Sequence, residues 1–270
     1  MCEILELNRS SYYKWVNREE TEKERHDQEI CQIILEYHER FKGILGYRRM
    51  TRGINRLNQT KYNKKRIRRL MRLLGISSVI RRKRKGYKKS TPQITAENVL
   101  DRKFEADAPN QKWLTDVTEF KIIESTQKVF LSAIIDLFDN SIVSYMMGTS
   151  NNNPLVFKTF DKAIEGNPEA KPLVHSDRGY QYTSKHFKHK LDKIEETQSM
   201  SRVGRCIDNG PMEGFWCTLK SEMYYLNQFH TKKDLEQAIH EYIKFYNNER
   251  FQDKLKDLTP IEYRNQALAA

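Results

Sequence analysis

The chain has 270 residues, of which 38% are hydrophobic and 31% charged, proportions typical of a folded protein with an extensive polar surface. Its 48 lysines and arginines exceed its 36 acids, and the formal charge of +12 favours an acidic polymer or an anionic membrane surface as partner. No apolar run approaches the roughly 20 residues that span a bilayer, and the four cysteines form no CxxC pair, so we expect neither a membrane protein nor a zinc or disulfide framework.

The N-terminal stretch is predicted to be helical. It begins MCEILELNRS, which contains acids and no long apolar core, so we expect no signal peptide. The cysteine usage favours a reducing, cytoplasmic location, which weakens the membrane alternative and leaves nucleic acid as the expected partner. Further on, Thr21-x-x-Glu24 is a capping box that predicts the start of a longer helix. The apolar stripe of that helix is Ile30, Ile33, Ile34, Tyr37 and Phe41.

The positive charge is concentrated in one segment. Residues 61–90 hold 14 lysines or arginines and no acid, so the rest of the chain sums to about −2 by the same counting. A helix capped by Asn63 carries apolar residues at i, i+3, i+4 and i+7 from Ile67, and Gly75 is well placed to end it. A second amphipathic helix, with Tyr47, Met50, Ile54 and Leu57 on its apolar face, precedes it.

Two short helices of this kind, the second densely basic, predict a helix-turn-helix-like unit that binds double-stranded DNA. A solvated charge run with no groove-docking geometry is the alternative, and whether the unit reads sequence or only the backbone stays open. The cations expected to contact DNA here are Arg48, Arg49, Arg52, Lys64, Lys65, Arg66, Arg68, Arg69, Arg72, Arg81, Arg82, Lys83 and Arg84.

A change of pattern after residue 110 predicts a second fold. Residues 91–108 lose periodicity and contain Pro92, which suggests a linker. KWLTDVTEFKII, KVFLSAIIDLF and SIVSYMMG are three strand-like runs with short breaks, followed by a helix at 153–167 and the buried strand KPLVHSD. This order predicts a mixed α/β domain over 109–225, after a helical basic region at 1–90 and before a helical extension at 226–270.

Three acids occupy unusual positions in this α/β region. Asp116 lies within an apolar strand, on the same face as Leu114 and Thr118; Asp177 follows a strand; and Glu213 begins a helix. Rigid supports of these kinds can bring carboxylates to one point, where hard oxygen ligands suit paired Mg²⁺ or Mn²⁺ ions about 4 Å apart. Each acid has an ordinary alternative, since a strand Asp can bond backbone amides and an Asp before Gly is commonly a turn residue.

Two spacings make the assignment of these acids to one catalytic site more specific. Asp177 and Glu213 are separated by 35 residues, and Lys220 follows Glu213 by seven, two turns along the same helix face, where it could meet DNA phosphate. The sequence resembles the OrfB-type transposases of the third insertion-sequence family, relatives of retroviral integrases with a D, D-x35-E signature. The matching stretches are the segment around KWLTDVTEF from Ala106, AIIDLFDN, HSDRGYQY, SMSRVGRCIDNGPMEGFWCTLKSE and YNNERFQDKLKDLTPIEYR.

The resemblance implies a ribonuclease-H-like core in which Asp116, Asp177 and Glu213 hold two Mg²⁺ or Mn²⁺ ions, with Lys220 as a basic helper. It implies 3′-end cleavage and strand transfer of an insertion sequence, with the element's terminal inverted repeats and target DNA as partners. It also implies an upstream-frame helix-turn-helix protein as a frameshift fusion partner. Because two DNA ends are handled together, we expect a dimer or larger assembly on DNA.

Other polar residues receive more modest expectations. Asp136 is expected to support the core or the metal ligands, and Asp208 to cap a helix or order its loop. His175 is expected to pack within its strand, with contact to substrate as the alternative. Residues 199–205 are predicted to be a mobile basic loop whose Arg202 and Arg205 embrace DNA, with surface solubility as the alternative. A non-catalytic transposase-derived DNA-binding regulator, and a structure-selective nuclease without joining activity, remain alternative functions.

Overall fold

The computed structural model describes residues 2, 8–80, 98–192, 197–202 and 206–269, and the chain forms two compact units, residues 1–79 and 80–270. The first unit is helical, with α1 (Arg9–Val16), α2 (Glu22–Arg40), α3 (Tyr47–Leu57) and α4 (Lys64–Leu73). Arg81, Arg82, Lys83, Arg84 and Arg205, which we expect to contact DNA, lie outside the described residues.

The helix ends of the first unit follow the sequence signals. Thr21 and Glu24 form the predicted capping box of α2, the Asn63 side chain accepts a hydrogen bond from the Lys65 backbone at the start of α4, and Gly75 adopts a left-handed φ of 67° just beyond its end. One prediction is wrong, because Leu57 is 48% exposed and lies outside the core. The buried apolar side chains of α2, α3 and α4 are Ile30, Ile34, Tyr37, Met50, Ile54, Ile67, Leu70 and Met71.

A five-stranded mixed sheet organises the second unit. The strands are β1 (Lys112–Lys121), β2 (Lys128–Asp136), β3 (Ile142–Gly148), β4 (Leu173–Ser176) and β5 (Gln198–Met200), in the order β3-β2-β1-β4-β5. β1 pairs antiparallel with β2 and parallel with β4, and β4 pairs parallel with β5. The predicted mixed α/β class is therefore confirmed, although Ser199 and Met200, predicted to lie in a loop, belong to the strand β5.

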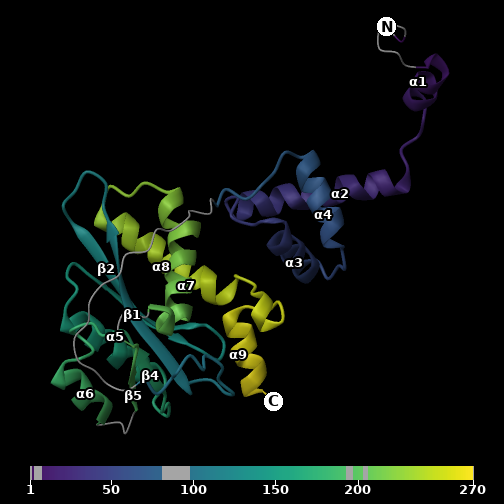
Figure 1. The fold of residues 1–270 in the computed structure, drawn as a ribbon. Coiled ribbons are helices and arrows are strands. Elements are labelled where there is room, and N and C mark those ends of the chain that lie inside the picture. Colours follow the sequence, from purple (N-terminus) through teal and green to yellow (C-terminus); the bar gives the residue numbers. More distant parts are fainter. Residues whose placement is uncertain (1, 3–7, 81–97, 193–196, 203–205, 270) are drawn as a thin grey trace. The chain divides into compact units, whose positions relative to one another are not determined.

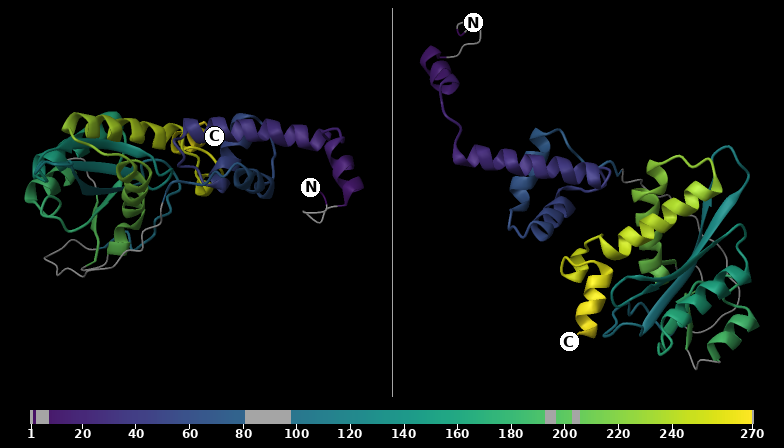
Figure 2. Two further views of the ribbon diagram at one scale, coloured as in Figure 1. Left: turned by 90° about the horizontal axis from the view of Figure 1, so that it is seen from above. Right: turned by 180° about the vertical axis from the view of Figure 1, so that it is seen from behind.

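Helices cover both faces of the sheet, as Figures 1 and 2 show. On one face α5 (Asn153–Gly166) and α6 (Lys185–Asp192) pack around Trp113, Val174 and Phe187. On the other face α7 (Gly210–Glu222) and α8 (Lys232–Asn248) pack around Leu114 and Phe120. Alternate residues of β1 thus serve two separate cores, and the even-numbered ones face α7. The remaining elements are α9 (Pro260–Leu268) and the short 3-10 helices Cys206–Asn209, Tyr224–Leu226 and Asp253–Leu255.

The C-terminal segment is fastened to the same core by polar contacts. The Asn247 side-chain amide accepts a hydrogen bond from the Ile142 backbone N–H at 2.9 Å and donates to its carbonyl at 3.0 Å. Arg250 donates both to Glu222 Oε1 at 2.9 Å and to Oε2 at 3.0 Å, a partly buried bidentate ion pair. These contacts give a structural reason for the YNNER run, which the sequence alone leaves without a role. In the described part of the chain, no helix has the length and apolar character required to cross a membrane.

Candidate active site

Asp116 and Asp177 lie on neighbouring parallel strands. Thr115 of β1 pairs with Ser176, the last residue of β4, so the two acids occupy the next position along each chain. β1 continues as a strand beyond this point whereas β4 ends, which leaves Asp177 at the beginning of a turn. The sheet therefore brings together two carboxylates that are 61 positions apart (177 − 116) in the sequence.

The helix α7 brings Glu213 to the same region. Trp216, one turn after Glu213, donates its indole N–H to Asp116 Oδ2 at 3.0 Å. Glu213 is exposed in the first turn of α7, where the helix dipole favours an acidic side chain. Its charge reaches Asp116, because Glu213 is among the groups that raise the pKa of the Asp116 carboxyl.

The ionised form of Asp116 is electrostatically disfavoured. Burial, followed by the charge of Asp177, raises the pKa of Asp116 from 3.8 to about 7, against the opposing hydrogen bonds from the Val117 N–H and Trp216. Burial also raises the pKa of Asp177. A carboxylate whose ionised form is this disfavoured suits a site that gains an external cation.

The turn after β4 fixes the Asp177 carboxylate. Asp177 Oδ1 accepts a hydrogen bond from the Gly179 N–H at 2.9 Å. A Cβ atom at position 179 would lie 3.0 Å from that oxygen and 2.8 Å from Gln181 Oε1, so a larger residue would push against the carboxylate. A larger residue at position 179 would therefore require the Gln181 and Asp177 side chains to move.

The donor set fits a divalent cation in its chemistry, since three carboxylates supply hard oxygen ligands. Across the residues that the structure describes, none of Asp116, Asp177 and Glu213 forms an ion pair with a lysine, arginine or histidine. Within that same part of the chain, no group of three His, Cys, Asp or Glu side chains is arranged closely enough to hold a metal ion. The three carboxylates therefore form no closed metal cage in the part of the chain that the structure describes.

Lys220 lies along the same strand. Its ammonium donates to Thr118 Oγ1 at 2.7 Å and lies 5.2 Å from the centre of the Phe120 ring. Thr118 is two residues beyond Asp116 on the same face of β1, so the Lys220 ammonium lies next to the strand that carries Asp116.

Asp208 orders the segment that leads into α7. Its buried carboxylate accepts hydrogen bonds from the Arg202 backbone N–H at 2.9 Å and from Arg102 Nε at 2.7 Å. The Arg202 guanidinium pairs with the same carboxylate at 3.0 Å, so this predicted DNA contact has an intramolecular partner. Burial raises the pKa of Asp208, but the hydrogen bonds from Arg202 and Arg102 outweigh it and leave that pKa well below its usual value. The loop-ordering role expected for Asp208 agrees with this arrangement.

His175 is a buried strand residue. Its Nδ1 lies 2.8 Å from Ser199 Oγ and its Nε2 lies 3.1 Å from Ser201 Oγ, which joins β4 to β5 and the residues after it. Burial lowers the pKa of His175 to about 4, so the ring is neutral at physiological pH. Both nitrogens form hydrogen bonds with serine hydroxyls, and the ring is buried, as expected from its position in the strand.

The predicted DNA-contacting cations of the first unit fall into two groups. Arg66 donates to Asp27 at 2.7 Å and Arg69 also pairs with Asp27, so both tie α4 to α2. Arg49 donates to the Ile44 carbonyl at 2.9 Å, and Arg52 is half-buried. The more exposed cations are Arg48, Lys64, Lys65, Arg68 and Arg72, and the Arg48 and Arg68 side chains lie over the Tyr47 ring.

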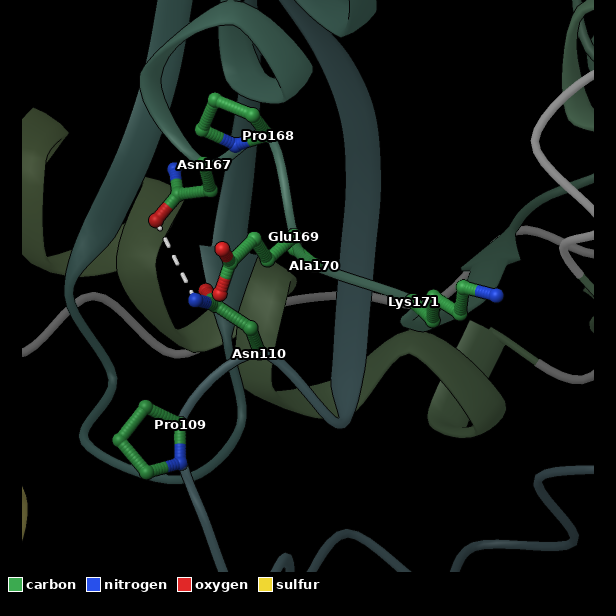
Figure 3. Close-up of a pocket in the computed structure, with 7 residues that line it drawn as sticks. All are labelled: Pro109, Asn110, Asn167, Pro168, Glu169, Ala170 and Lys171. Carbon is green, nitrogen blue, oxygen red and sulfur yellow. Dashed lines mark hydrogen bonds between the residues drawn. The ribbon is translucent and has the colours of Figure 1, made fainter.

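A pocket of about 470 Å³ lies elsewhere in the second unit, between the loops that lead into β1 and β4 (Figure 3). Asn110 donates to Asn167 Oδ1 at 3.2 Å across it. Asp116 and Asp177 follow the paired segment of these strands, whereas the pocket residues precede it, so the pocket is separate from the carboxylates. Its lining residues are Pro109, Asn110, Asn167, Pro168, Glu169, Ala170 and Lys171.

Sequence reasoning missed two residues near the carboxylates. Trp216 appears from sequence to be only part of an aromatic-rich helix, although its N–H meets Asp116. The Tyr182 hydroxyl lies 3.1 Å from Thr115 Oγ1, and the nearby charges of Asp116 and Asp177 add to burial in raising its pKa. Both aromatic residues lie in quoted motifs, but no spacing rule separates a core aromatic from one with a polar contact.

Comparison with known protein families matches most of the chain. One integrase core domain family matches residues 106–206, a second integrase core domain family matches residues 213–268, and an HTH-like domain family matches residues 25–84. The integrase matches include all three carboxylates, and the HTH-like match includes α2, α3 and α4.

Individual proteins give the same picture. The chain is 44% identical over 232 residues to InsK of insertion sequence element IS150 from Escherichia coli (strain K12), covering 85% of this chain and 80% of that protein. It is 32% identical over 250 residues to the transposase for insertion sequence element IS904 from Lactococcus lactis subsp. lactis (strain IL1403), covering 92% and 96%.

A solved structure shares the fold. The simian T-cell lymphotropic virus intasome, in complex with PP2A regulatory subunit B56 gamma, matches with a TM-score of 0.51 and 17% identity, over 86% of this chain and 74% of that chain. The predicted ribonuclease-H-like core and the helix-turn-helix-like region before it are confirmed by these likenesses together with the sheet topology.

Proposed function

Because the chain belongs to the insertion-sequence transposases of the third family, which carry an integrase core domain, we propose that it cleaves DNA at the 3′ ends of its element and joins those ends to target DNA. Asp116, Asp177 and Glu213 are the proposed catalytic residues. The single observation that carries the assignment is their convergence from two adjacent parallel strands and the first turn of α7, with Asp177 and Glu213 both raising the pKa of Asp116.

The proposal requires a divalent cation, Mg²⁺ or Mn²⁺, held as a pair of ions by these three carboxylates. When bound, such ions activate the attacking oxygen and stabilise the leaving oxygen of a phosphodiester. The chain itself contributes fixed supports: β1 orients Asp116, the Gly179 N–H orients Asp177, and α7 presents Glu213. Lys220, bonded to Thr118, is proposed to contact DNA phosphate next to the carboxylates.

DNA binding is assigned to the first unit. The HTH-like match covers its helices, and Lys64, Lys65, Arg68 and Arg72 are exposed on α4. We propose that this basic face binds the terminal inverted repeats of the element. The proposal extends to a dimer or larger assembly on DNA, an upstream helix-turn-helix protein as fusion partner, and a cytoplasmic, nucleoid-associated location.

A strand-transfer assay tests the catalytic proposal. Oligonucleotides carrying the element's own ends are incubated with target DNA and Mn²⁺, using the wild type, Asp177→Asn and the surface control Asp107→Asn. The proposal expects cleavage and joining by the wild type and by D107N, and neither by D177N, because its amide cannot replace an anionic ligand. Equal activity of D177N and wild type refutes the triad. DNA binding without cleavage by the wild type would instead favour a regulator.

A further inference from the structure

Three side-chain contacts fasten α7 to β1 at successive turns of the helix. Trp216 Nε1 donates to Asp116 Oδ2 at 3.0 Å, and Lys220 donates to Thr118 at 2.7 Å. The Tyr224 hydroxyl, just beyond α7, accepts from the Lys121 N–H at 3.1 Å and donates to its carbonyl at 2.7 Å. The helix residues are spaced by four, so the contacts fix how far α7 is shifted along β1. Figure 1 shows α7 on the sheet.

The Trp216 contact differs from the other two because it reaches a carboxylate proposed as a metal ligand. The indole N–H only donates, so Trp216 can neither accept a proton nor bind a cation through nitrogen. Its side chain is 6% exposed and packs against Phe215 at a ring-centre distance of 5.0 Å, which prevents it from swinging away. A rigid neutral donor is therefore directed at one oxygen of Asp116.

Each carboxylate oxygen of Asp116 accepts one hydrogen bond from the protein. Oδ2 accepts from Trp216, and Oδ1 accepts from the Val117 N–H at 2.8 Å. Each carboxylate oxygen has two lone pairs, so each keeps one for a further ligand. Metal-binding carboxylates commonly have such hydrogen-bond donors behind them, and these donors set the direction of the remaining lone pairs.

We propose that Trp216 is a positioning residue for Asp116: its indole N–H holds the carboxylate in the orientation that binds the divalent cation. The same bond sets the distance between Asp116 and Glu213, because Glu213 lies one turn earlier on the helix that carries Trp216. Without this donor, Asp116 would rotate more freely and lose affinity for the cation. The inference rests on the proposed function of Asp116 as a metal ligand.

A purely structural role for Trp216 predicts something different. A buried indole needs an acceptor, and in that case Asp116 would only satisfy it. Replacing Trp216 by Phe would then lower stability without changing cation affinity. The two roles are therefore separated by a binding measurement rather than by stability.

The experiment measures Mn²⁺ binding to the full-length protein from the paramagnetic resonance signal of the free ion, without DNA and without reference to activity. The variants are Trp216→Phe, which keeps the ring and loses the N–H, and the matched control Tyr224→Phe, which removes another α7–β1 contact away from the carboxylates. We expect W216F to weaken Mn²⁺ binding about 10-fold or more and Y224F to leave it unchanged. Equal affinity of W216F and wild type, while Asp116→Asn weakens binding, overturns the inference and leaves the proposed triad intact. If D116N binds Mn²⁺ as the wild type does, the proposed triad itself fails.

A second measurement needs no substitution at Trp216. The protein contains three tryptophans, so its nitrogen-15 spectrum has three indole N–H signals. Adding Mg²⁺ should move the Trp216 signal and leave that of Trp113, whose N–H donates to Asn110 at 3.3 Å, in place. A Trp216 signal that stays fixed when Mg²⁺ saturates the protein contradicts the inference, even if W216F does not fold.

Discussion

Asp136 and Asp139 lie near the start of β1, and Asp116 and Asp177 lie further along it, where β4 ends. Both pairs are acidic and burial raises the pKa of all four carboxyls. The first pair has its own cation, because Arg264 of α9 approaches Asp136 to 3.2 Å and Asp139 to 3.1 Å.

The second pair has no such partner in the chain as far as the structure describes it, and Glu213 adds another negative charge. The comparison separates acids that the protein pairs with its own arginines from acids that have no such partner among the described residues. Asp208 with Arg102 and Arg202, and Glu222 with Arg250, belong to the first kind. An acid buried with a dedicated arginine is thus a structural acid in this protein.

The largest expected effect comes from Asp116→Asn. It should lower strand transfer at least about 1000-fold, since an interaction made in the transition state is lost. At the same time the urea midpoint of the metal-free protein should stay equal or rise, because the substitution removes a buried charge that Asp177 repels. Strand-transfer rates and urea unfolding of the same preparation measure both effects. Loss of activity accompanied by a large loss of stability would contradict the distinction between the two acidic pairs.

Arg264→Met, unlike Asp116→Asn, should lower the stability of the protein. It leaves Asp136 and Asp139 buried without their cation, which costs on the order of 3–5 kcal/mol in the free energy of unfolding. Urea unfolding measures the loss, and the triple variant R264M/D136N/D139N should recover much of it. A change of less than about 1 kcal/mol in the free energy of unfolding would show that Arg264 does little to offset the burial of Asp136 and Asp139.

The pH dependence of stability should separate the two acidic pairs. The pKa of Asp116 is raised from 3.8 to about 7 and that of Asp136 to about 6. Over the range between the ordinary and the raised pKa, the folded protein holds protons that the unfolded chain has released, so the free energy of unfolding falls as pH rises. In metal-free protein, D116N should reduce this fall up to about pH 7, and D136N only up to about pH 6.

Urea midpoints measured across this range provide the check. Saturating Mg²⁺ should also reduce the fall in the wild type, because the cation favours the ionised carboxylates. A D116N profile with the same slope as the wild type between about pH 6 and about pH 7 would contradict the prediction.

The smallest expected effect concerns the cations of the first unit, where an exposed arginine can be compared with a paired one. Arg68 is exposed on α4, whereas Arg66 pairs with Asp27 at 2.7 Å. Arg68→Ala should weaken binding to end DNA a few-fold and reduce the slope of log affinity against log salt by about 1. Arg66→Ala should chiefly lower the unfolding midpoint of the protein. Fluorescence anisotropy over a salt series tests this, and an unchanged slope for R68A would remove it from the DNA contacts.

Sequence alone predicted the parts of the fold with strong periodicity. The first three strands and the helix α5 were recognised because alternation or helical spacing persists over seven residues or more. The helix α6 and the strand β5 were missed, since eight and three residues leave little periodicity to detect. β5 depends on its pairing with β4, a contact that the local sequence does not encode.

The candidate site was predictable to a similar degree. Asp116 stood out because an acid within an apolar strand is unusual, and the spacing of Glu213 and Lys220 added specificity. The Trp216 and Arg264 contacts were not predictable, because each joins residues about 100 or more positions apart. Pairing of Arg66 with Asp27 likewise depends on how α4 packs against α2, so sequence counted it simply as a basic residue.

The long separations between α7 and β1 also bear on the order of folding. The three contacts that join them link residues 100, 102 and 103 positions apart. Contacts of this range form late, because loop closure must come before they stabilise anything. During synthesis, the helical unit and the β1–β2–β3 meander emerge long before α7 does. We therefore expect a nascent chain to form its basic face while Asp116 is still without Trp216 and Glu213, ahead of the assembled carboxylate site.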